Sequence, residues 1–289
     1  MLSKKEIVKN ILACSICGSS LNFDNHEEMI CFANSQHKFK LKNEVFEFKT
    51  YSDDVTEKHP DHIFSNIKNY FKKFPTLYYI LVHVVGATPV NKSPKKFVKS
   101  ISKDKVIINI GSGPHILRED VINLDIYPYR GVSITASAEK LPIADGSVDV
   151  VVCDNLLEHV EGAERAIKEI VRVLKTGGQA YIGTPFMNGF HSSPNDFYRW
   201  THEGLRVVLL PFFKEEELDI AYGPTAATLL ILQDWLAMLL SFNIRFLYEG
   251  WQMVFMIIFI PLKPLDYILS KYQFAKSIAL NLYFIGIKK

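Results

Sequence analysis

The sequence predicts an α/β fold built on an open, mostly parallel sheet. Three observations support this class. Large apolar residues at 106–110 run straight into Gly-Ser-Gly at 111–113, short apolar runs return at 121–125, 132–136, 148–153 and 179–184, and residues 163–174 repeat with a helical period. Continuous apolar runs suit strands that are buried on both faces of a parallel sheet, and the amphipathic stretch suits a helix that covers it.

Length and composition set further bounds. The chain has 289 residues, of which 48% are hydrophobic and 22% charged, with a formal net charge of +2. This length allows one sizeable domain and a small one. The charge balance does not favour a nucleic-acid-binding face. No small-residue cleavage site follows the first residues, so we expect no secretory signal and a cytoplasmic protein.

The turn after the first predicted strand is the candidate cofactor site, with Gly111, Ser112 and Gly113. Glycine lets a backbone turn sharply and approach a ligand, and open α/β sheets bind nucleotides beyond the carboxyl ends of their strands. Asp125 ends the second predicted strand, where a carboxylate can accept hydrogen bonds from both ribose hydroxyls of an adenosine ligand. No third glycine follows as a dinucleotide-binding turn requires, so a smaller adenosine ligand without phosphates is favoured.

Further motifs follow in a fixed order: AEKLP at 138–142, DGSVD at 145–149, LEHV at 157–160 and EIVRVLKTGG at 169–178. Between about residues 105 and 220 the chain resembles class I S-adenosylmethionine (SAM) dependent methyltransferases of the type 11 kind. The resemblance implies a Rossmann-like, seven-stranded methyltransferase sheet and SAM as cofactor. It adds Ala138, Glu139, Asp154 and Asn155 to the expected cofactor contacts. Asn109 departs from the pattern, because the family often has an acid there.

The amino-terminal residues 1–50 form a predicted ribbon domain. A Cys-x-x-Cys knuckle places two thiolates on one turn, and a second hairpin can complete a tetrahedral zinc site. The candidate metal ligands are Cys14, Cys17, Cys31 and His37. The segment is similar to zinc-ribbon pieces that precede some methyltransferases, although Asn34 stands where such ribbons have a fourth cysteine, and His26 is a weaker substitute than His37. A metal-free ribbon with inert cysteines is the alternative. Alternating residues at 38–41 and 45–48 predict two strands.

Residues 51–104 form the expected helical linker, with helical spacing at 63–74, an apolar run at 77–85 and a polar, basic connector at 91–96. The apolar run is too short to span a bilayer, which needs about 20 residues. We expect it to cover the sheet, with contact to a membrane as the alternative.

The segment at 185–201 follows the fifth strand and is dense in polar and aromatic residues. It resembles the substrate-side segment of methyltransferases found with surface-polysaccharide biosynthesis. His191, Asp196 and His159 are the candidates for a catalytic base, which a hydroxyl acceptor requires. Tyr198, Arg199 and Trp200 are the candidates for substrate binding. The alternatives are structural: His191 bonds a backbone carbonyl, Asp196 caps a turn, and Arg199 pairs with it. Thr201 is the predicted N-cap of the next helix.

Residues 224–278 are an apolar insertion between the predicted sixth strand, 216–221, and the seventh, 280–287. The apolar runs at 228–240 and 251–262 are not long enough for a confident membrane span. Aromatic and lysine side chains flank the second run, which favours a helical pair in the membrane interface, peripheral to the inner membrane. A helical lid or a homodimer face are the alternatives.

Together these features predict a SAM-dependent methyltransferase domain at 105–289, preceded by the ribbon and the linker. The resemblance and the apolar insertion favour a small-molecule sugar or a lipid-linked saccharide as substrate. One alternative is a ribosomal RNA methyltransferase, which would require a basic groove. The other is a non-catalytic, SAM-binding adaptor subunit.

Overall fold

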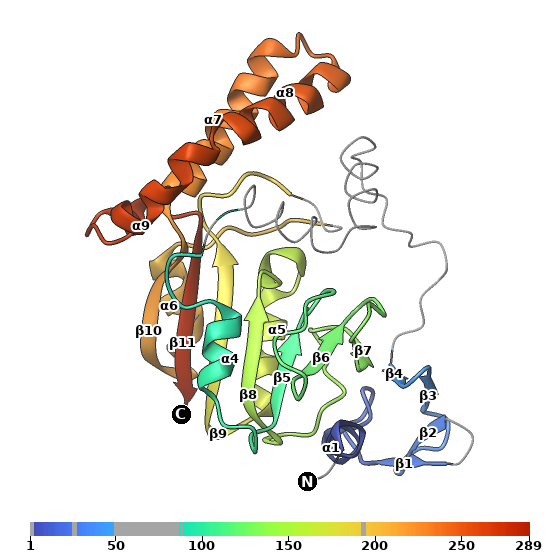
Figure 1. Cartoon of the computed structure of the whole chain (residues 1–289). Helices are drawn as coiled ribbons and strands as arrows, with labels where there is room; N and C mark the ends of the chain where they lie inside the picture. Colours follow the sequence, from blue (N-terminus) through green and yellow to red (C-terminus); the bar gives the residue numbers. More distant parts are fainter. Residues whose placement is uncertain (1–2, 25–27, 49–86, 88, 192–194) are drawn as a thin grey trace.

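The structure is a computed structural model that describes residues 3–24, 28–48, 87, 89–191 and 195–289. Within these residues one sheet of 11 strands has the order β1-β2-β3-β4-β7-β6-β5-β8-β9-β11-β10 (Figure 1). The helical spacing at 63–74 and the apolar run at 77–85 lie outside the described residues.

The predicted seven-stranded core occupies one side of this sheet. Its parallel strands are β5 (Ile107–Ile110), β6 (Ile122–Asp125), β7 (Ile134–Thr135), β8 (Val148–Asp154) and β9 (Leu174–Pro185). The last strand, β11 (Asn281–Lys288), runs antiparallel between β9 and β10 (Phe213–Tyr222). The carboxyl ends of the parallel strands therefore meet at one edge, which is where this class of sheet binds its ligand.

Four amino-terminal strands make the sheet larger than predicted. After α1 (Lys4–Ile11), the strands β1 (Leu21–Phe23), β2 (Glu28–Cys31), β3 (Lys38–Lys42) and β4 (Val45–Glu47) form an antiparallel meander. β4 then pairs in parallel with β7, with Phe46 opposite Ile134. The expected count of seven is wrong for this reason: the short strand β7 would otherwise leave an open sheet edge, and the ribbon occupies it.

Helices cover both faces of the core. On one face, residues of α1, α5 (Ala163–Val173) and α6 (His202–Leu209) share a hydrophobic cluster with alternate residues of β5, such as Ile108. On the other face, Phe97 of α4 (Pro94–Ser100) packs near Ile107 and Tyr181. Predicted as part of a connector, α4 is a helix because Ser93 caps it and Pro94 suits its first turn. Thr201 caps α6 as predicted.

The apolar insertion is helical and projects from the sheet (Figure 1). It consists of α7 (Pro224–Leu240), α8 (Arg245–Ile258), η2 (Ile260–Leu265), α9 (Asp266–Leu269) and η3 (Ala275–Ser277). Among the described residues, no single helix has both the length and the apolarity to cross a membrane. α8 and the helical segment Ile260–Leu269 reach that length only together, and a bend of 50° separates them.

Candidate functional site

The turn between β5 and the following loop has the backbone conformation that the glycines predict. Gly111 and Gly113 have φ values of +69° and +52°, in the left-handed region. A Cβ atom on Gly111 would lie 2.8 Å from Cδ1 of Leu156, so this position excludes a side chain. The backbone N–H groups of Gly111 and Ser112 both donate to the carbonyl of Leu124, at 2.8 and 3.1 Å, which ties the turn to β6.

Asp125 lies against this turn, as predicted. Its Oδ2 accepts a hydrogen bond from the N–H of Gly113 at 2.7 Å, and its Oδ1 accepts one from Tyr127 at 3.0 Å. Burial raises the pKa of Asp125. A carboxylate offers about four lone-pair positions, so two remain after these bonds. The group is therefore placed, and still able, to accept the two hydroxyl groups of a ribose.

Asn109, where the family often has an acid, is satisfied inside the sheet. Its amide donates to Oδ1 of Asn123 at 3.3 Å, and the amide of Asn123 in turn donates to the carbonyl of Gly131 at 3.1 Å. Both side chains are buried. At the position where the family often has an acid, this chain therefore has a neutral amide that forms a hydrogen bond between β5 and β6.

The other predicted cofactor residues lie after β7 and β8. Ala138 is buried, whereas Glu139 accepts hydrogen bonds from Arg165 at 2.6 and 2.9 Å and from the N–H of Gly162 at 3.1 Å. This arrangement ties Glu139 to the start of α5. Its contact with a cofactor stays a prediction.

Asp154 and Asn155 lie at the carboxyl end of β8, at the crevice edge. Asn155 has a φ of +53°, and its Oδ1 accepts a hydrogen bond from Asn281 at 2.5 Å. The side chain of Asp154 lies over Gly183, where it leaves no room for a Cβ atom. Burial raises the pKa of Asp154 to about 6.

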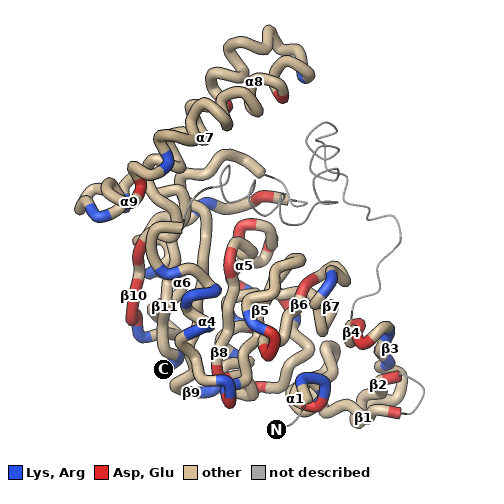
Figure 2. The backbone as a smooth tube through the Cα atoms, viewed as in Figure 1, with Lys and Arg blue, Asp and Glu red and all other residues tan. Residues whose placement is uncertain are grey.

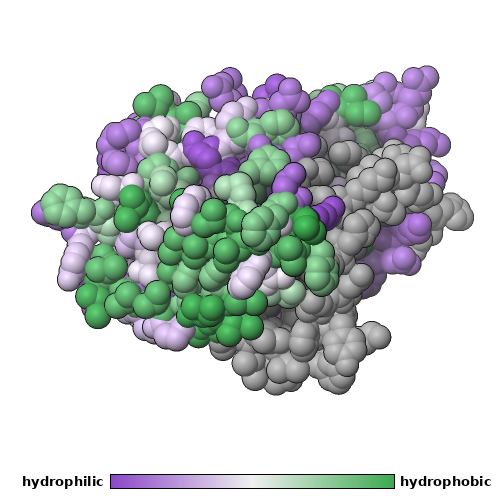
Figure 3. All heavy atoms as spheres, turned by 90° about the horizontal axis from the view of Figure 1, so that it is seen from above, coloured by the Kyte–Doolittle hydropathy of each residue, from purple (hydrophilic) through white to green (hydrophobic). Residues whose placement is uncertain are grey.

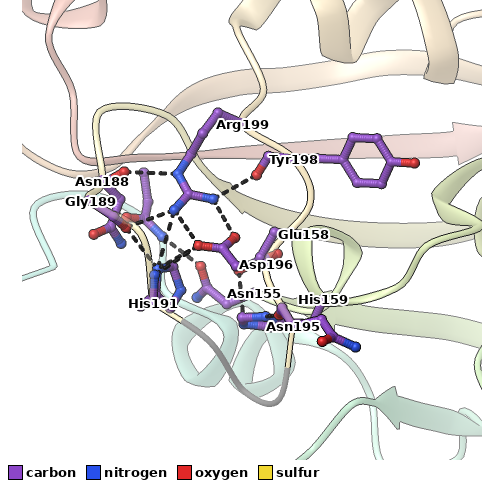
Figure 4. A network of polar contacts seen from close by, with 11 residues as sticks. Asn155, Glu158, His159, Asn188, Gly189, His191, Asn195, Asp196, Tyr198 and Arg199 are labelled. Carbon is purple, nitrogen blue, oxygen red and sulfur yellow. Dashed lines mark hydrogen bonds and ion pairs between the residues drawn. The ribbon is translucent and has the colours of Figure 1, made fainter. Parts of the chain in front are cut away.

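The predicted substrate-side segment after β9 forms a polar network centred on Arg199 (Figure 4). The guanidinium donates to both oxygens of Asp196, at 2.5 and 2.6 Å, and to the carbonyls of Asn188 and Gly189. Burial opposes ionisation of Asp196, but Arg199 and the N–H of His191 hold its pKa at about 2. This pairing, one of the structural alternatives, makes Asp196 a weak base and a strong organiser of the loop.

His159 and His191 face each other beside this pair. Their ring centroids are 5.2 Å apart and the rings are perpendicular. Nδ1 of His159 lies 2.6 Å from the carbonyl of Asn195, and Nδ1 of His191 lies 3.1 Å from that of Gly189. Burial lowers the pKa of His159, so this imidazole is neutral near pH 7. The structure therefore brings the three predicted bases together, because Asp196 also accepts the N–H of His191 at 2.8 Å.

Glu158 is a functional candidate that the sequence interpretation missed. Its side chain is 0% exposed, and burial raises its pKa to about 8. Its Oε1 lies 3.8 Å from Nε2 of His159. The available signal was the position of Glu158, directly before His159 and just after a buried strand that ends at the crevice. Loops at that edge carry function more often than helix starts elsewhere.

The three predicted substrate-binding residues are not equivalent. Arg199 is occupied by the network, and the Tyr198 hydroxyl donates to the carbonyl of Glu161 at 2.6 Å. The rings of Tyr198 and Trp200 are 5.6 Å apart. The indole N–H of Trp200 is buried without a hydrogen-bond partner among the described residues. Tyr198 is partly exposed and so is the better placed of the two rings to meet a substrate.

The predicted metal ligands of the ribbon also converge. The candidate ligand atoms of Cys14, Cys17, Cys31 and His37 all lie within 4.8 Å of one another. The Sγ of Cys14 is 3.5 Å from Nδ1 of His37, and the side-chain amide of Asn34 is 3.2 Å from Nε2 of the same ring. Asn34 therefore positions the imidazole that takes the place of a fourth cysteine. The four cysteines of the chain are free thiols.

Comparison with known proteins bears on the catalytic half of the chain. Residues 117–182 match the family described as a methyltransferase domain. The chain carries a class I SAM-dependent methyltransferase domain. The Rossmann-like methyltransferase fold and SAM as its cofactor are thereby confirmed.

Two curated relatives match short stretches of the chain. A human (Homo sapiens) thiol S-methyltransferase is 47% identical over 50 residues, which are 17% of this chain and 20% of that protein. A ubiquinone biosynthesis O-methyltransferase of Dechloromonas aromatica is 38% identical over 56 residues, 19% of this chain and 23% of that protein. The chain thus spans about a fifth of the length of these relatives.

A solved structure of phosphoethanolamine N-methyltransferase 2 from Haemonchus contortus, in complex with SAM, superposes with a TM-score of 0.44 at 15% identity. The match covers 76% of this chain and 59% of that one.

The methyltransferase crevice fits SAM by its own geometry. Gly111 and Gly113 turn the chain sharply beyond the end of β5, and Asp125 accepts two hydrogen bonds from the backbone beside this turn. SAM carries no phosphates, which agrees with the lack of a third glycine. Gly111, Ser112, Gly113 and Asp125 are the residues that would hold it.

Proposed function

We propose that the protein is a SAM-dependent methyltransferase that acts on a hydroxyl group of a sugar or a lipid-linked saccharide at a membrane surface. One observation carries the finer part of this proposal: the acceptor loop adjoins the root of the apolar insertion. A Cβ on Gly189 would be 3.7 Å from Oδ2 of Asp234 in α7. The N–H groups of Phe186 and Met187 donate to the carbonyls of Leu280 and Ala279, at the end of the insertion.

The reaction needs few protein groups. An acceptor oxygen attacks the methyl carbon of SAM, the C–O bond forms, and the C–S bond breaks with its electron pair moving to sulfur. Holding the two partners in line and excluding water supply most of the acceleration. A hydroxyl acceptor must also lose its proton. The imidazoles of His159 and His191 lie beside the acceptor loop and are the groups suited to receive it.

The surface of the insertion supports the choice of a membrane. Figure 3 shows apolar side chains gathered over these helices, and Figure 2 shows few charges along α7 and α8. Phe242 is 81% and Phe246 69% exposed. The polar groups bond within the hairpin instead: Gln252 donates to Asp234 at 2.7 Å, and Arg245 donates to Glu249 at 2.7 Å. Apolar side chains on the outside of the hairpin are what a lipid environment favours, while Oε2 of Glu249 stays buried without a hydrogen-bond partner among the described residues.

The acceptor is tested by radiolabelled methyl transfer from SAM into fractionated cell envelope and into RNA. We expect label in a saccharide or lipid-linked fraction. Label in RNA alone would support the ribosomal RNA alternative, and a protein that binds SAM but labels neither fraction would support the adaptor alternative.

The membrane proposal is tested by flotation with liposomes. We expect the parent chain to float and a Phe242→Ser, Phe246→Ser double variant to remain in the dense fraction. Val207→Ser is the matched control, since Val207 is 74% exposed on α6, outside the insertion. A dimer that buries the hairpin and ignores lipid would refute the proposal.

We also propose that Cys14, Cys17, Cys31 and His37 hold a structural zinc ion. Three thiolates and one imidazole form an ordinary zinc donor set, and a ribbon of about 50 residues has little core of its own. Metal analysis of the purified chain should give one zinc per molecule, lost in Cys14→Ser. Cys153→Ala, at a core cysteine of β8, should retain it.

A further inference from the structure

The side chain of Glu158 is a buried carboxylate that the described residues leave unpaired. It is 0% exposed, and neither Oε1 nor Oε2 has a hydrogen-bond partner among those residues. A carboxylate that is removed from water without a partner destabilises the fold strongly. A buried acid without a partner keeps its proton near neutral pH, and a cation bound beside it would release that proton and stabilise the carboxylate.

Two imidazoles adjoin Glu158, and the contacts of His159 leave one of its ring nitrogens free to act as a ligand. Nδ1 of His159 and Nδ1 of His191 each contact a backbone carbonyl, at 2.6 and 3.1 Å. A carbonyl oxygen only accepts hydrogen bonds, so Nδ1 of His159 carries the proton and its Nε2 keeps its lone pair. Nδ1 of His191 also lies 3.4 Å from a guanidinium nitrogen of Arg199, which only donates, so its contacts are compatible with either tautomer. Histidines that bind metals characteristically donate their second ring N–H to a carbonyl or carboxylate, as His159 does.

The three side chains lie at ligand spacing. One ring nitrogen from each of His159 and His191 and one oxygen of Glu158 all lie within 4.8 Å of one another. The cluster runs from the interior to the crevice, because the Glu158 side chain is 0%, that of His159 13% and that of His191 41% exposed. Asp196 is already engaged by three donors, since Arg199 bonds both of its oxygens and the N–H of His191 bonds Oδ2.

We propose that Glu158, His159 and His191 bind one divalent cation of the Mn²⁺ or Zn²⁺ type beside the methyl acceptor. Two imidazoles and one carboxylate suit such cations and leave positions open for an oxygen of the substrate. The inference rests on the proposed function, because it places the cation where the acceptor hydroxyl must bind.

A cation at this site changes the role of the imidazoles. A divalent cation held by these residues would lower the pKa of a bound hydroxyl group, whose proton would then pass to solvent. The resulting alkoxide then forms the C–O bond while the C–S bond of SAM breaks. The two histidines therefore act as ligands when the cation is bound, and as direct proton acceptors only without it.

The test is a titration of the full-length, SAM-saturated protein with Mn²⁺, followed by electron paramagnetic resonance. The thiolate site of the ribbon is first filled with zinc, so that Mn²⁺ reports the second cluster. We expect one Mn²⁺ per chain, with affinity at least about tenfold weaker in Glu158→Gln and in His191→Asn. Glu161→Gln and His202→Asn, which lie outside the cluster, should bind Mn²⁺ as the parent does.

The inference is overturned if the parent binds no Mn²⁺, or if all five proteins bind it equally. Calorimetry with SAM is run on each variant, and Glu158→Asp replaces Glu158→Gln if the latter fails to bind SAM. If methyl transfer continues unchanged in the presence of a chelator, the proposed cation site is refuted, but the proposed methyltransferase function is not. A parent chain that does not bind SAM would instead overturn the proposed function itself.

Discussion

The predicted cofactor site and the predicted acceptor site use different kinds of chemical group. The cofactor half consists of strand ends and tight turns, in which backbone N–H groups and one carboxylate, Asp125, do the positioning. The acceptor half consists of side chains from η1 (Leu157–His159) and from a long loop, held by the Arg199–Asp196 pair. All but one of the charged groups of the acceptor network are paired, and the exception is Glu158 among the described residues.

The difference teaches which half carries specificity. Backbone groups at strand ends contact the cofactor, which is the same in all SAM-dependent enzymes. Substitutions at these positions are poorly tolerated. Side chains on a loop can be exchanged without altering the sheet, so the acceptor can differ between proteins with the same cofactor site. The following variants separate the two halves, since each should affect one and spare the other.

The largest effect should come from Glu158→Gln. The variant keeps the shape of the side chain but removes the charge that would bind a cation. We expect the rate of methyl transfer to fall by about 10²–10⁴-fold, the usual range for losing a group that activates the acceptor. SAM affinity, measured by calorimetry, should stay within about twofold. A parallel loss of SAM affinity would show that the two halves are not separable.

Asp125→Ala should act on the other half. It removes two charge-assisted hydrogen bonds to ribose, at about 1.5–3 kcal/mol each, and frees the Gly113 amide. We expect SAM affinity to fall by roughly 100-fold or more in calorimetry, with Mn²⁺ binding retained. Asp104→Asn, at an exposed surface carboxylate, is the control and should bind SAM like the parent. Normal SAM binding by Asp125→Ala would contradict the assigned cofactor site.

Arg199→Lys should loosen the acceptor loop alone. Lysine cannot reproduce the two parallel bonds to Asp196 or reach the carbonyls of Asn188 and Gly189 at once. We expect kcat/KM for the acceptor to fall about 10–50-fold, mainly through KM, while the KM for SAM is unchanged. Steady-state kinetics with each substrate varied in turn test this assignment. A rise in the KM for SAM as well as in the KM for the acceptor would contradict it.

Gly111→Ala should give a smaller, cofactor-side effect. Alanine at a φ of +69° is strained by about 1–2 kcal/mol, and its methyl group meets Leu156. We expect roughly tenfold weaker SAM binding and a lower melting temperature. Gly177→Ala has a similar φ of +76° but open space around its Cβ, and it should be destabilised without losing SAM affinity. Equal SAM affinities in the two variants would refute the steric argument.

A separate effect, on stability and not on activity, should be a pH dependence. The pKa of Glu158 is about 8 in the folded protein, above its ordinary value of 4.5. The unfolded chain therefore loses this proton first, and folded stability falls as pH rises from 4.5 to 8. Thermal melts in a chelator should show the advantage of Glu158→Gln over the parent growing between pH 5 and 8 and levelling above. An advantage that is constant with pH would mean that Glu158 is already ionised.

The cofactor half was largely predictable from the sequence. Gly111, Gly113 and Asp125 lie at the ends of two buried strands, and each strand can be recognised as a run of apolar residues that stops there. The strand order could also be expected once the class was known. The addition of four strands could not, because the pairing of β4 with β7 depends on a free sheet edge and not on local pattern.

The acceptor half was predictable only as a list of residues. The sequence places His191 and Asp196 on one loop, but their roles depend on which side chain forms a salt bridge with Arg199. Once Arg199 bonds Asp196, that carboxylate is too stable as an anion to serve as a base. Glu158 was overlooked for the opposite reason: its importance comes from the partners that it lacks among the described residues, and no sequence pattern reports a missing hydrogen bond.

The root of the projecting helices fixes their direction. Asp266 is buried and accepts the N–H groups of Thr225 and Ala226 at 2.6 and 2.9 Å, and a Cβ atom on Gly223 would lie 2.5 Å from its carboxylate. This clamp makes the helical pair a stiff arm, not a loose tether. If the arm is immersed in lipid, it orients the whole enzyme on the bilayer and sets the height of the crevice above it. Acceptors would then be selected by how far their reactive group stands from the surface, as well as by their chemistry.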